Sequence, residues 1–224
     1  MGKMLPRYIS SLSRARSFSF IKGYILGNLI KHYGIWGIFS LVYEKVLTYF
    51  LFKNAKIIRR PFDCRGKKNI KIGRGFSSGR YCRFEAHGQH GEINIAIGDN
   101  CQVNDSVHIA ALKSVSIADN VLIASRVFIT DLNHGGYGGD LHSDPLSICK
   151  DRPLIGTPVV IEQNVWLGEG VVVLPGVTIG QGTIIGANAV VSKNIPAFSI
   201  AVGNPAKVIK AYNFEQQKWL SIHG

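Results

Sequence analysis

Aliphatic residues recur every six positions along the segment from Val159 to Ser192. One series consists of Ile161, Leu167, Val173, Ile179, Ile185 and Val191, and a second lies four residues further on, at Val165, Val171, Val177, Thr183 and Ala189. A period of six fits neither an amphipathic α-helix nor a simple alternating strand. It predicts a repeat in which six residues form one short strand and a turn, three units form a triangular coil, and stacked coils bury one aliphatic column.

The repeat extends toward the N-terminus with less regularity. Ile97, Val103 and Ile109 mark one coil, the phase slips by two at Lys113-Ser114, and a further coil follows with Ile117, Ile123 and Ile129. Residues 131–158 contain no hexad, so we expect them to protrude from the stack as a long loop. Long loops on rigid repeats are usually functional. We expect the repeat domain to span residues 61–203.

The two ends of the chain lack the repeat. Residues 1–60 are basic and apolar and predict two amphipathic helices, near residues 18–32 and 36–53. The apolar run 35–52 is interrupted by Glu44 and Lys45, which argues against a membrane-spanning helix. Residues 204–224 are expected to form a short C-terminal helix that covers the last coil.

Charge is concentrated in the N-terminal part of the chain. The protein has 26 basic and 14 acidic residues, a formal net charge of +12. Residues 1–68 contain 14 basic and 2 acidic residues, which leaves 12 of each for residues 69–224. This excess favours a phosphate-bearing partner. We expect peripheral contact of residues 1–68 with an anionic membrane, although the same helices could simply cap the open end of the stack.

Cysteine usage favours a reducing compartment. Cys64, Cys82, Cys101 and Cys149 form no CxxC pair, and no secretory signal peptide follows the N-terminal charges. We therefore expect the protein in the cytoplasm, peripherally at the inner face of the membrane if the basic segment binds lipid.

Three motifs resemble the hexapeptide-repeat acyltransferases, in particular their galactoside, maltose and xenobiotic acetyltransferase branch. They are NVWLGEGVVVLPGVTIG, IIGANAVVSKNIP and AVGNPAKVIK, within a resemblance that covers about residues 93–211. The resemblance implies an all-β, left-handed parallel β-helix, acetyl-CoA as the acetyl donor, and a homotrimer in which one copy completes the groove of the next. The motifs do not specify the acceptor.

His134 is the predicted catalytic base. It lies at the start of the protruding loop, in Asp131-Leu132-Asn133-His134, which resembles the place of the catalytic histidine in this family. An imidazole can take a proton from an acceptor hydroxyl and return it to the leaving thiolate. Asp131 is a candidate to orient the imidazole, a role that a backbone carbonyl could also fill. By resemblance, Asn104 could bind the acceptor or the developing oxyanion, or else form part of an asparagine ladder at a corner.

The resemblance also implies a set of donor-binding residues. Trp166 would line the groove between subunits, and Gly168, Glu169 and Ala187 would present backbone groups to pantetheine. Where the family often has a small residue this chain has Glu169, whose side chain must turn away from the groove. Positions near the nucleotide are Ser192, Lys193, Pro205, Lys207 and Lys210.

Other histidines leave open alternatives. His87 and His90 could contact an acceptor at the rim. His108 and His134 lie on successive coils, but no third histidine at fitting spacing completes a carbonic-anhydrase type of zinc site.

We therefore expect an acetyl-CoA-dependent O-acetyltransferase with no metal and no nucleic-acid partner. Its acceptor would be a sugar hydroxyl of a cell-surface glycan (capsule, O-antigen or exopolysaccharide) or of its lipid-linked precursor. The alternatives are N-acetylation of a nucleotide-linked amino sugar or an antibiotic, a non-enzymatic scaffold that binds membrane or a partner, and a metal hydratase.

Overall fold

The computed structural model describes residues 7–89 and 91–222, which fall into two compact units, Met1–Val46 and Leu47–Gly224. The helix α1 (Arg7–Leu51) is interrupted at Gly34, whose φ of 66° and ψ of 173° are non-helical. Glycine reaches this region at little cost because it has no Cβ. The sequence prediction of two helices is thus confirmed, with the break at Gly34, but the first helix begins at Arg7 rather than near residue 18. The second unit begins at Leu47, earlier than the boundary expected after residue 60.

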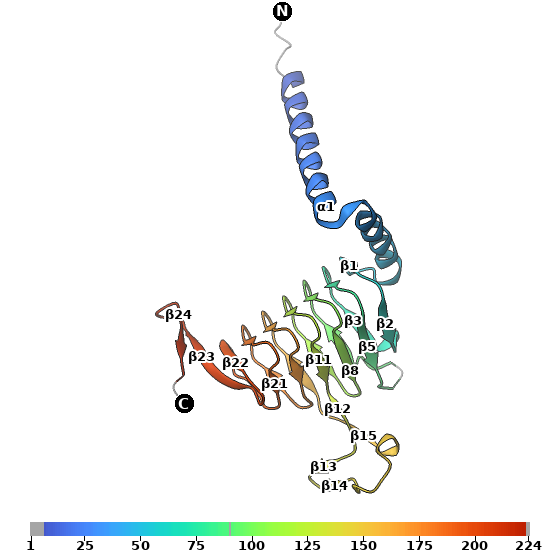
Figure 1. The fold of residues 1–224 in the computed structure, drawn as a ribbon, viewed down its shortest axis with the longest axis vertical. Helices are drawn as coiled ribbons and strands as arrows, with labels where there is room; N and C mark the ends of the chain where they lie inside the picture. Colours follow the sequence, from blue (N-terminus) through green and yellow to red (C-terminus); the bar gives the residue numbers. More distant parts are fainter. Residues whose placement is uncertain (1–6, 90, 223–224) are drawn as a thin grey trace, which may run out of the picture. The chain divides into compact units, whose positions relative to one another are not determined.

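The second unit is a parallel β-helix built from three sheets (Figure 1). The nine-stranded sheet contains, in order, β1 (Ile57–Ile58), β4 (Ser77–Ser78), β7 (Gln102–Val103), β10 (Leu122–Ile123), β17 (Trp166–Leu167), β20 (Ile184–Ile185), β22 (Ser199–Val202), β23 (Lys207–Asn213) and β24 (Lys218–Ser221). The six-stranded sheet contains β2 (Phe62–Arg65), β5 (Cys82–Ala86), β8 (His108–Ala111), β11 (Phe128–Thr130), β18 (Val172–Val173) and β21 (Val190–Val191). The five-stranded sheet contains β3 (Ile70–Ile72), β6 (Ile95–Ile97), β9 (Val115–Ile117), β16 (Val159–Ile161) and β19 (Thr178–Ile179), and a 3₁₀ turn η1 (Lys67–Asn69) precedes β3.

The aliphatic series that defines the repeat fills the interior. Both series from Ile161 to Val191 are buried, including the one polar member, Thr183, whose hydroxyl donates to the Pro196 carbonyl at 2.8 Å. Strands in successive coils pair in register, so that Ile123 lies beside Leu167, and Leu167 beside Ile185. Like side chains therefore stack into continuous columns, and the hexad prediction is confirmed.

The chain visits the three sheets in a fixed order and turns at three corners. Corner 1 denotes the turns from the nine-stranded to the six-stranded sheet, corner 2 those from the six-stranded to the five-stranded sheet, and corner 3 those that return to the nine-stranded sheet. Corner 1 is tight at Gly168, where an added Cβ would lie 2.7 Å from the backbone nitrogen of Ala187. Only glycine fits such a close approach of two coils.

The segment 131–158 leaves the stack at corner 2, as the missing hexads predicted. It contains β12 (Leu132–His134), β13 (Tyr137–Gly138), β14 (Leu141–His142), the 3₁₀ turn η2 (Cys149–Asp151) and β15 (Leu154–Gly156). β12 pairs antiparallel with β15, and β13 with β14. Figure 1 shows this segment projecting beyond the coils. We refer to it below as the excursion.

The C-terminal tail is not helical, and that part of the prediction was wrong. β23 pairs antiparallel with β22, and β24 with β23, so residues 207–221 form a hairpin that extends the nine-stranded sheet (Figure 1). The last coil would otherwise leave an edge strand with unpaired backbone N–H and C=O groups. Val208, Ile209, Tyr212 and Trp219 are residue types that favour strands, so the tail satisfies that edge as a strand rather than covering it as a helix.

Candidate active site

Backbone pairing on both sides fixes His134. It is the last residue of β12 and pairs with Leu154 of β15, and the next residue, Gly135, donates its N–H to the Pro153 carbonyl at 2.8 Å. The side chain is exposed, and within residues 7–89 and 91–222 its imidazole has no hydrogen-bond partner. The structure thus presents an accessible imidazole on a hydrogen-bonded backbone, and accessibility is one requirement of general-base chemistry.

Asp131 has a different role from the expected one. Its side chain is fully buried; Oδ1 accepts the Leu112 N–H at 2.7 Å, and Oδ2 accepts the N–H groups of Lys113 and Ser114, each at 2.7 Å. No hydrogen bond joins it to the His134 imidazole in the described part of the chain. Its carboxylate instead anchors the backbone where the hexad phase slips, so the expectation that Asp131 orients the imidazole is not supported.

Tyr137 and Arg152 connect the two sides of the excursion, and the sequence analysis missed both. The Tyr137 hydroxyl donates to the His134 carbonyl and accepts from Arg152 Nη1 at 2.9 Å. Arg152 also donates to Ser147 Oγ at 2.9 Å and to the Pro145 carbonyl at 3.1 Å. These bonds order the excursion around the histidine. Because residues 131–158 have no periodic pattern, the sequence did not indicate the roles of Tyr137 and Arg152.

The predicted pantetheine-binding residues and the predicted acceptor residue Asn104 lie at corner 1. Asn104 follows β7, Gly168 and Glu169 follow β17, and Ala187 follows β20, so all four occupy stacked turns of this corner. Trp166 lies beside them on the outer face of the nine-stranded sheet, with 47% of its surface exposed. Asn104 accepts a hydrogen bond from Gln102 Nε2 through its side-chain oxygen at 3.1 Å. A stacked column of short turns with one large aromatic beside it offers backbone amides along an extended surface.

Glu169 forms an ion pair with Arg126 of the preceding coil at the same corner. Both side chains are largely exposed, so the pair contributes little to stability. It does, however, hold the carboxylate toward the preceding coil rather than toward Ala187. The resemblance implied that this side chain turns away from the groove, and the ion pair provides a specific partner for it.

The other predicted donor residues are spread over two places. Ser192 and Lys193 follow β21 at corner 2, and both are exposed. Pro205 is exposed in the turn between β22 and β23, where the Ala206 N–H donates to the Val190 carbonyl at 2.8 Å. Lys207 and Lys210 lie on β23, beside Val202 and Ile200 of β22.

Apart from the residues of the β22–β23 hairpin, the structure therefore separates the predicted residues of one copy into two groups. His134, Asp131, Ser192 and Lys193 lie at corner 2, while the acceptor and pantetheine candidates lie at corner 1. The strands of the six-stranded sheet run between these two corners. His87, which is exposed, follows β5 at corner 2 as well, whereas His90 lies outside the described residues.

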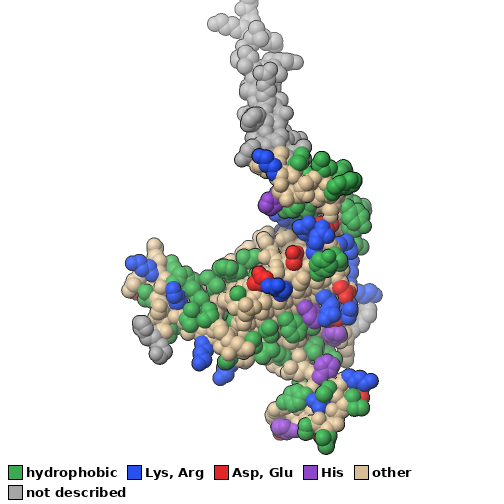
Figure 2. Space-filling view, viewed as in Figure 1, with side chains coloured by type: hydrophobic (Ala, Val, Ile, Leu, Met, Phe, Trp, Pro, Cys, Tyr) green, Lys and Arg blue, Asp and Glu red, His purple; other side chains and the backbone are tan. Residues whose placement is uncertain are grey.

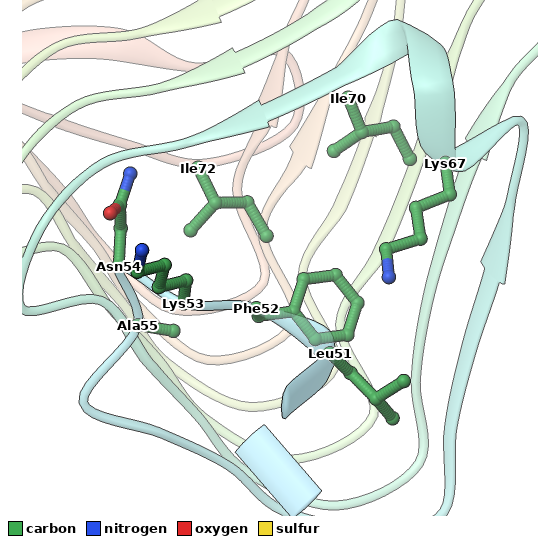
Figure 3. Close-up of a pocket in the computed structure, with 8 residues that line it drawn as sticks. All are labelled: Leu51, Phe52, Lys53, Asn54, Ala55, Lys67, Ile70 and Ile72. Carbon is green, nitrogen blue, oxygen red and sulfur yellow. The ribbon is translucent and has the colours of Figure 1, made fainter. Parts of the chain in front are cut away.

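Two cavities of the second unit contain none of the predicted site residues. One, of about 190 Å³, is lined by Leu51, Phe52, Lys53, Asn54, Ala55, Lys67, Ile70 and Ile72 at the N-terminal end of the β-helix (Figure 3). There Lys67 Nζ lies 4.5 Å from the centre of the Phe52 ring. The other, of about 360 Å³, is a shallow hollow at corner 3 around Asp99 and Asp119. Glu169 and Ala187 at corner 1, and His134 at the start of the excursion, are exposed in one copy.

A charged cluster covers the six-stranded sheet between the two corners. Glu85, with 9% of its side chain exposed, accepts from Arg65 Nη1 at 2.6 Å and pairs with Arg83 Nε at 3.2 Å and His108 Nε2 at 2.7 Å. Burial opposes ionisation of Glu85, but the hydrogen bond from His108 and the charges of Arg83 and Arg65 outweigh it and lower its pKa. The sequence analysis treated His108 only as a metal candidate. In the described part of the chain no three ligand-type side chains converge as a metal site.

Comparison with known proteins identifies the class. Residues 158–193 match the family described as bacterial transferase hexapeptide (six repeats). The protein WbbJ of Escherichia coli K12, named as a lipopolysaccharide biosynthesis O-acetyl transferase, is 47% identical over 195 residues, which cover 85% of this chain and 96% of WbbJ. The galactoside O-acetyltransferase of the same strain is 38% identical over 120 residues, which cover 54% of this chain and 55% of that enzyme.

The fold agrees with a solved structure as well. AntD, an N-acyltransferase from Bacillus cereus crystallised with dTDP and 3-hydroxybutyryl-CoA, superposes with a TM-score of 0.63 at 20% identity, over 79% of this chain and 92% of that one. At this identity the likeness concerns the fold. The chain belongs to the hexapeptide-repeat acyltransferases, and its β-helix is the left-handed parallel type of that family. It is an enzyme of the acyltransferase class, as the sequence predicted.

Proposed function

We propose that this protein transfers an acetyl group from acetyl-CoA to a sugar hydroxyl of a cell-surface glycan (capsule, O-antigen or exopolysaccharide) or of its lipid-linked precursor, in the cytoplasm. The likeness to WbbJ over nearly the whole length of that protein supports both the O-acetyl chemistry and the glycan acceptor. The single structural observation that carries the proposal is the exposed imidazole of His134, held by β12 and β15 at the start of the excursion.

His134 acts as the general base. One imidazole nitrogen accepts the proton of the acceptor hydroxyl while that oxygen bonds to the thioester carbonyl carbon. The tetrahedral intermediate then collapses, the carbon–sulfur bond breaks, and the imidazolium returns the proton to the leaving thiolate. The products are an O-acetyl ester and coenzyme A. Asn104, whose amide is partly exposed at corner 1, binds the acceptor or the negative charge on the carbonyl oxygen.

The acetyl-CoA arm lies along corner 1. Pantetheine carries amide groups, which pair with backbone groups at the small turns of Gly168, Glu169 and Ala187. Trp166 covers one side of the arm, and Pro205 packs on adenine. Lys193, Lys207 and Lys210 serve the phosphates as point charges, near Ser192.

The enzyme works as a homotrimer. In one copy, His134 and corner 1 lie at opposite ends of the strands of the six-stranded sheet. Each therefore needs a surface that its own copy does not supply. A cyclic arrangement in which corner 2 of one copy meets corner 1 of the next completes three equivalent sites. This arrangement also covers Trp166, whose exposure is otherwise costly.

The test follows free thiol while the purified protein turns over acetyl-CoA with sugar, oligosaccharide and glycolipid acceptors, and with a nucleotide-linked amino sugar as the N-acetylation arm. His134→Ala should lower the rate by about 100-fold or more, because a general base supplies that much. The matched control is His142→Ala, an exposed histidine elsewhere on the excursion. If His134→Ala retains full activity, or if only the amino-sugar nucleotide is acetylated, the proposal is wrong.

A further inference from the structure

Residues 35–46 of α1 carry their apolar side chains toward solvent. Ile35, Trp36, Phe39, Val42, Tyr43 and Val46 are all at least half exposed, with Trp36 at 85%. The one carboxylate of this stretch, Glu44, is 2% exposed. An ordinary surface helix turns its apolar stripe inward, whereas this helix exposes a large apolar surface.

The six exposed side chains form one continuous surface, which we call the apolar arc. At about 100° per residue they fall within roughly 120° of the helix circumference, and Glu44 lies on the opposite side. The hydrophobic surface of α1 is visible in Figure 2. Contiguous exposed apolar patches mark sites of interaction, whereas single exposed apolar residues need no explanation.

Charge in the same unit is almost entirely positive. Up to Val46 the only acidic residue is the buried Glu44, and the basic residues are Lys3, Arg7, Arg14, Arg16, Lys22, Lys31 and Lys45. Lys31 and Lys45 are exposed near the two ends of the apolar arc. A partner that is apolar at its surface and negatively charged above it would match both features.

We propose that the apolar arc inserts into the headgroup region of a bilayer that contains anionic lipid. Trp and Tyr prefer this region because one end of each ring is apolar and the other polar. Each basic residue near an anionic surface adds about 1 kcal/mol to binding. A helix with an apolar arc and basic residues near it can lie in the interface plane. In the described part of the chain no helix is long and apolar enough to cross a membrane.

A second copy of the chain fits the same surface less well. A coiled-coil seam is a narrower stripe of mostly Leu, Ile and Val, whereas this arc contains Trp, Phe and Tyr. Two copies would also bring like charges together, whereas an anionic bilayer attracts them. Membrane docking adds a partner to the proposed function and does not depend on which acceptor the enzyme uses.

The experiment measures sedimentation of the full-length protein with vesicles of phosphatidylcholine containing about 30% phosphatidylglycerol, and with vesicles of phosphatidylcholine alone. The wild type should bind the anionic vesicles at least about tenfold more tightly, and high salt should reduce the difference. The double variant Trp36→Ser/Phe39→Ser should weaken binding at least about tenfold, because two large apolar side chains no longer enter the interface. Tyr81→Ser, which removes an exposed aromatic residue from the β-helix, is the matched control and should bind as the wild type does.

Three results would overturn the inference. They are a wild type that stays in the supernatant with anionic vesicles, a double variant that binds as tightly as the wild type, or a double variant whose assembly falls apart, which would assign the arc to a contact between copies. Thermal unfolding and turnover with a soluble acceptor should be unchanged in the double variant. Because vesicle binding is measured without acetyl transfer, failure here is distinguishable from failure of the proposed function.

Discussion

Corner 1 and corner 2 both connect strands of neighbouring sheets, but their turns differ in length and structure. At corner 1 every coil turns within a few residues, and the turns stack closely enough that Gly168 has no room for a side chain. At corner 2 one turn is replaced by the excursion, which carries two strand pairs and His134. The regular corner offers backbone along a line, and the irregular corner offers one side chain held away from the stack. Binding of an extended donor suits the first, and proton transfer suits the second.

The excursion at corner 2 requires a compensating interaction, which Asp131 provides. The buried carboxylate satisfies three backbone N–H groups at Leu112, Lys113 and Ser114, where the preceding coil loses its hexad phase. The slip in one coil and the excursion of the next are thus parts of one structural adaptation. The predictions below change one corner at a time.

The largest effect is expected from a large side chain at corner 1. Ala187→Arg should lower acetyl transfer about 100-fold, because the guanidinium arm occupies the surface where pantetheine would lie. The control is Ala197→Arg, which places the same side chain on an exposed alanine of corner 3. Equal loss in both variants, measured by thiol release, would mean that corner 1 has no special role.

The next effect is expected at corner 2, on stability rather than chemistry. Asp131→Asn should lower the free energy of unfolding by about 3 kcal/mol, because an amide NH₂ cannot accept the backbone N–H groups that the carboxylate serves. Urea unfolding measures this change. Asp140→Asn, at an exposed position of the excursion, is the control. Full stability with a large fall in kcat would instead restore Asp131 as the partner of His134.

A smaller effect, on the KM for acetyl-CoA, is expected from a substitution beside corner 1. Trp166→Ala should raise KM for acetyl-CoA about tenfold with a smaller change in kcat, because the indole covers the bound donor rather than the reacting atoms. Leu122→Ala is the control, since Leu122 pairs with Trp166 in register on the preceding coil and is also partly exposed. An unchanged KM would leave Trp166 with a role in packing between copies alone.

The smallest effect is expected from a substitution in the charged cluster on the six-stranded sheet, and it concerns stability at acid pH. The lowered pKa of Glu85 means that its contribution to stability is present above the ordinary carboxyl pKa and is lost as pH falls through the lowered value. Glu85→Gln should therefore flatten the acid side of the stability profile by under about 1 kcal/mol, because Arg65 and Arg83 are half exposed. Acetyl transfer at neutral pH should not change. A clear fall in activity would mean that this sheet face belongs to the site.

The sequence predicted most of the fold because its signal is periodic. A hexad held over six repeats leaves one solution for the burial of Ile161, Leu167 and their equivalents, and the loss of the hexad marked the excursion at residues 131–158. The tail was mispredicted because its strand character depends on the open edge of β22, which is a tertiary feature. Local sequence does not reveal a partner that lies elsewhere in the fold.

The geometry of the candidate site was predictable only in part. Resemblance pointed to His134 at the start of the excursion and to the turns of corner 1. It could not reveal that Asp131 faces the slipped backbone at Lys113, or that Tyr137 and Arg152 order the excursion. These contacts join residues with no common spacing, so only the folded chain brings them together.

The most direct test mixes two defective copies. His134→Ala and Ala187→Arg chains carrying different tags are co-expressed, and assemblies that contain both tags are purified. Each variant alone should be nearly inactive, whereas mixed assemblies should recover about a third of the wild-type activity per site, because every trimer that contains both variants has one site of three that combines an intact histidine with an intact corner 1 from the next copy. Mixed assemblies that form but stay inactive would contradict the account, since the base and the donor corner would then have to act within one copy.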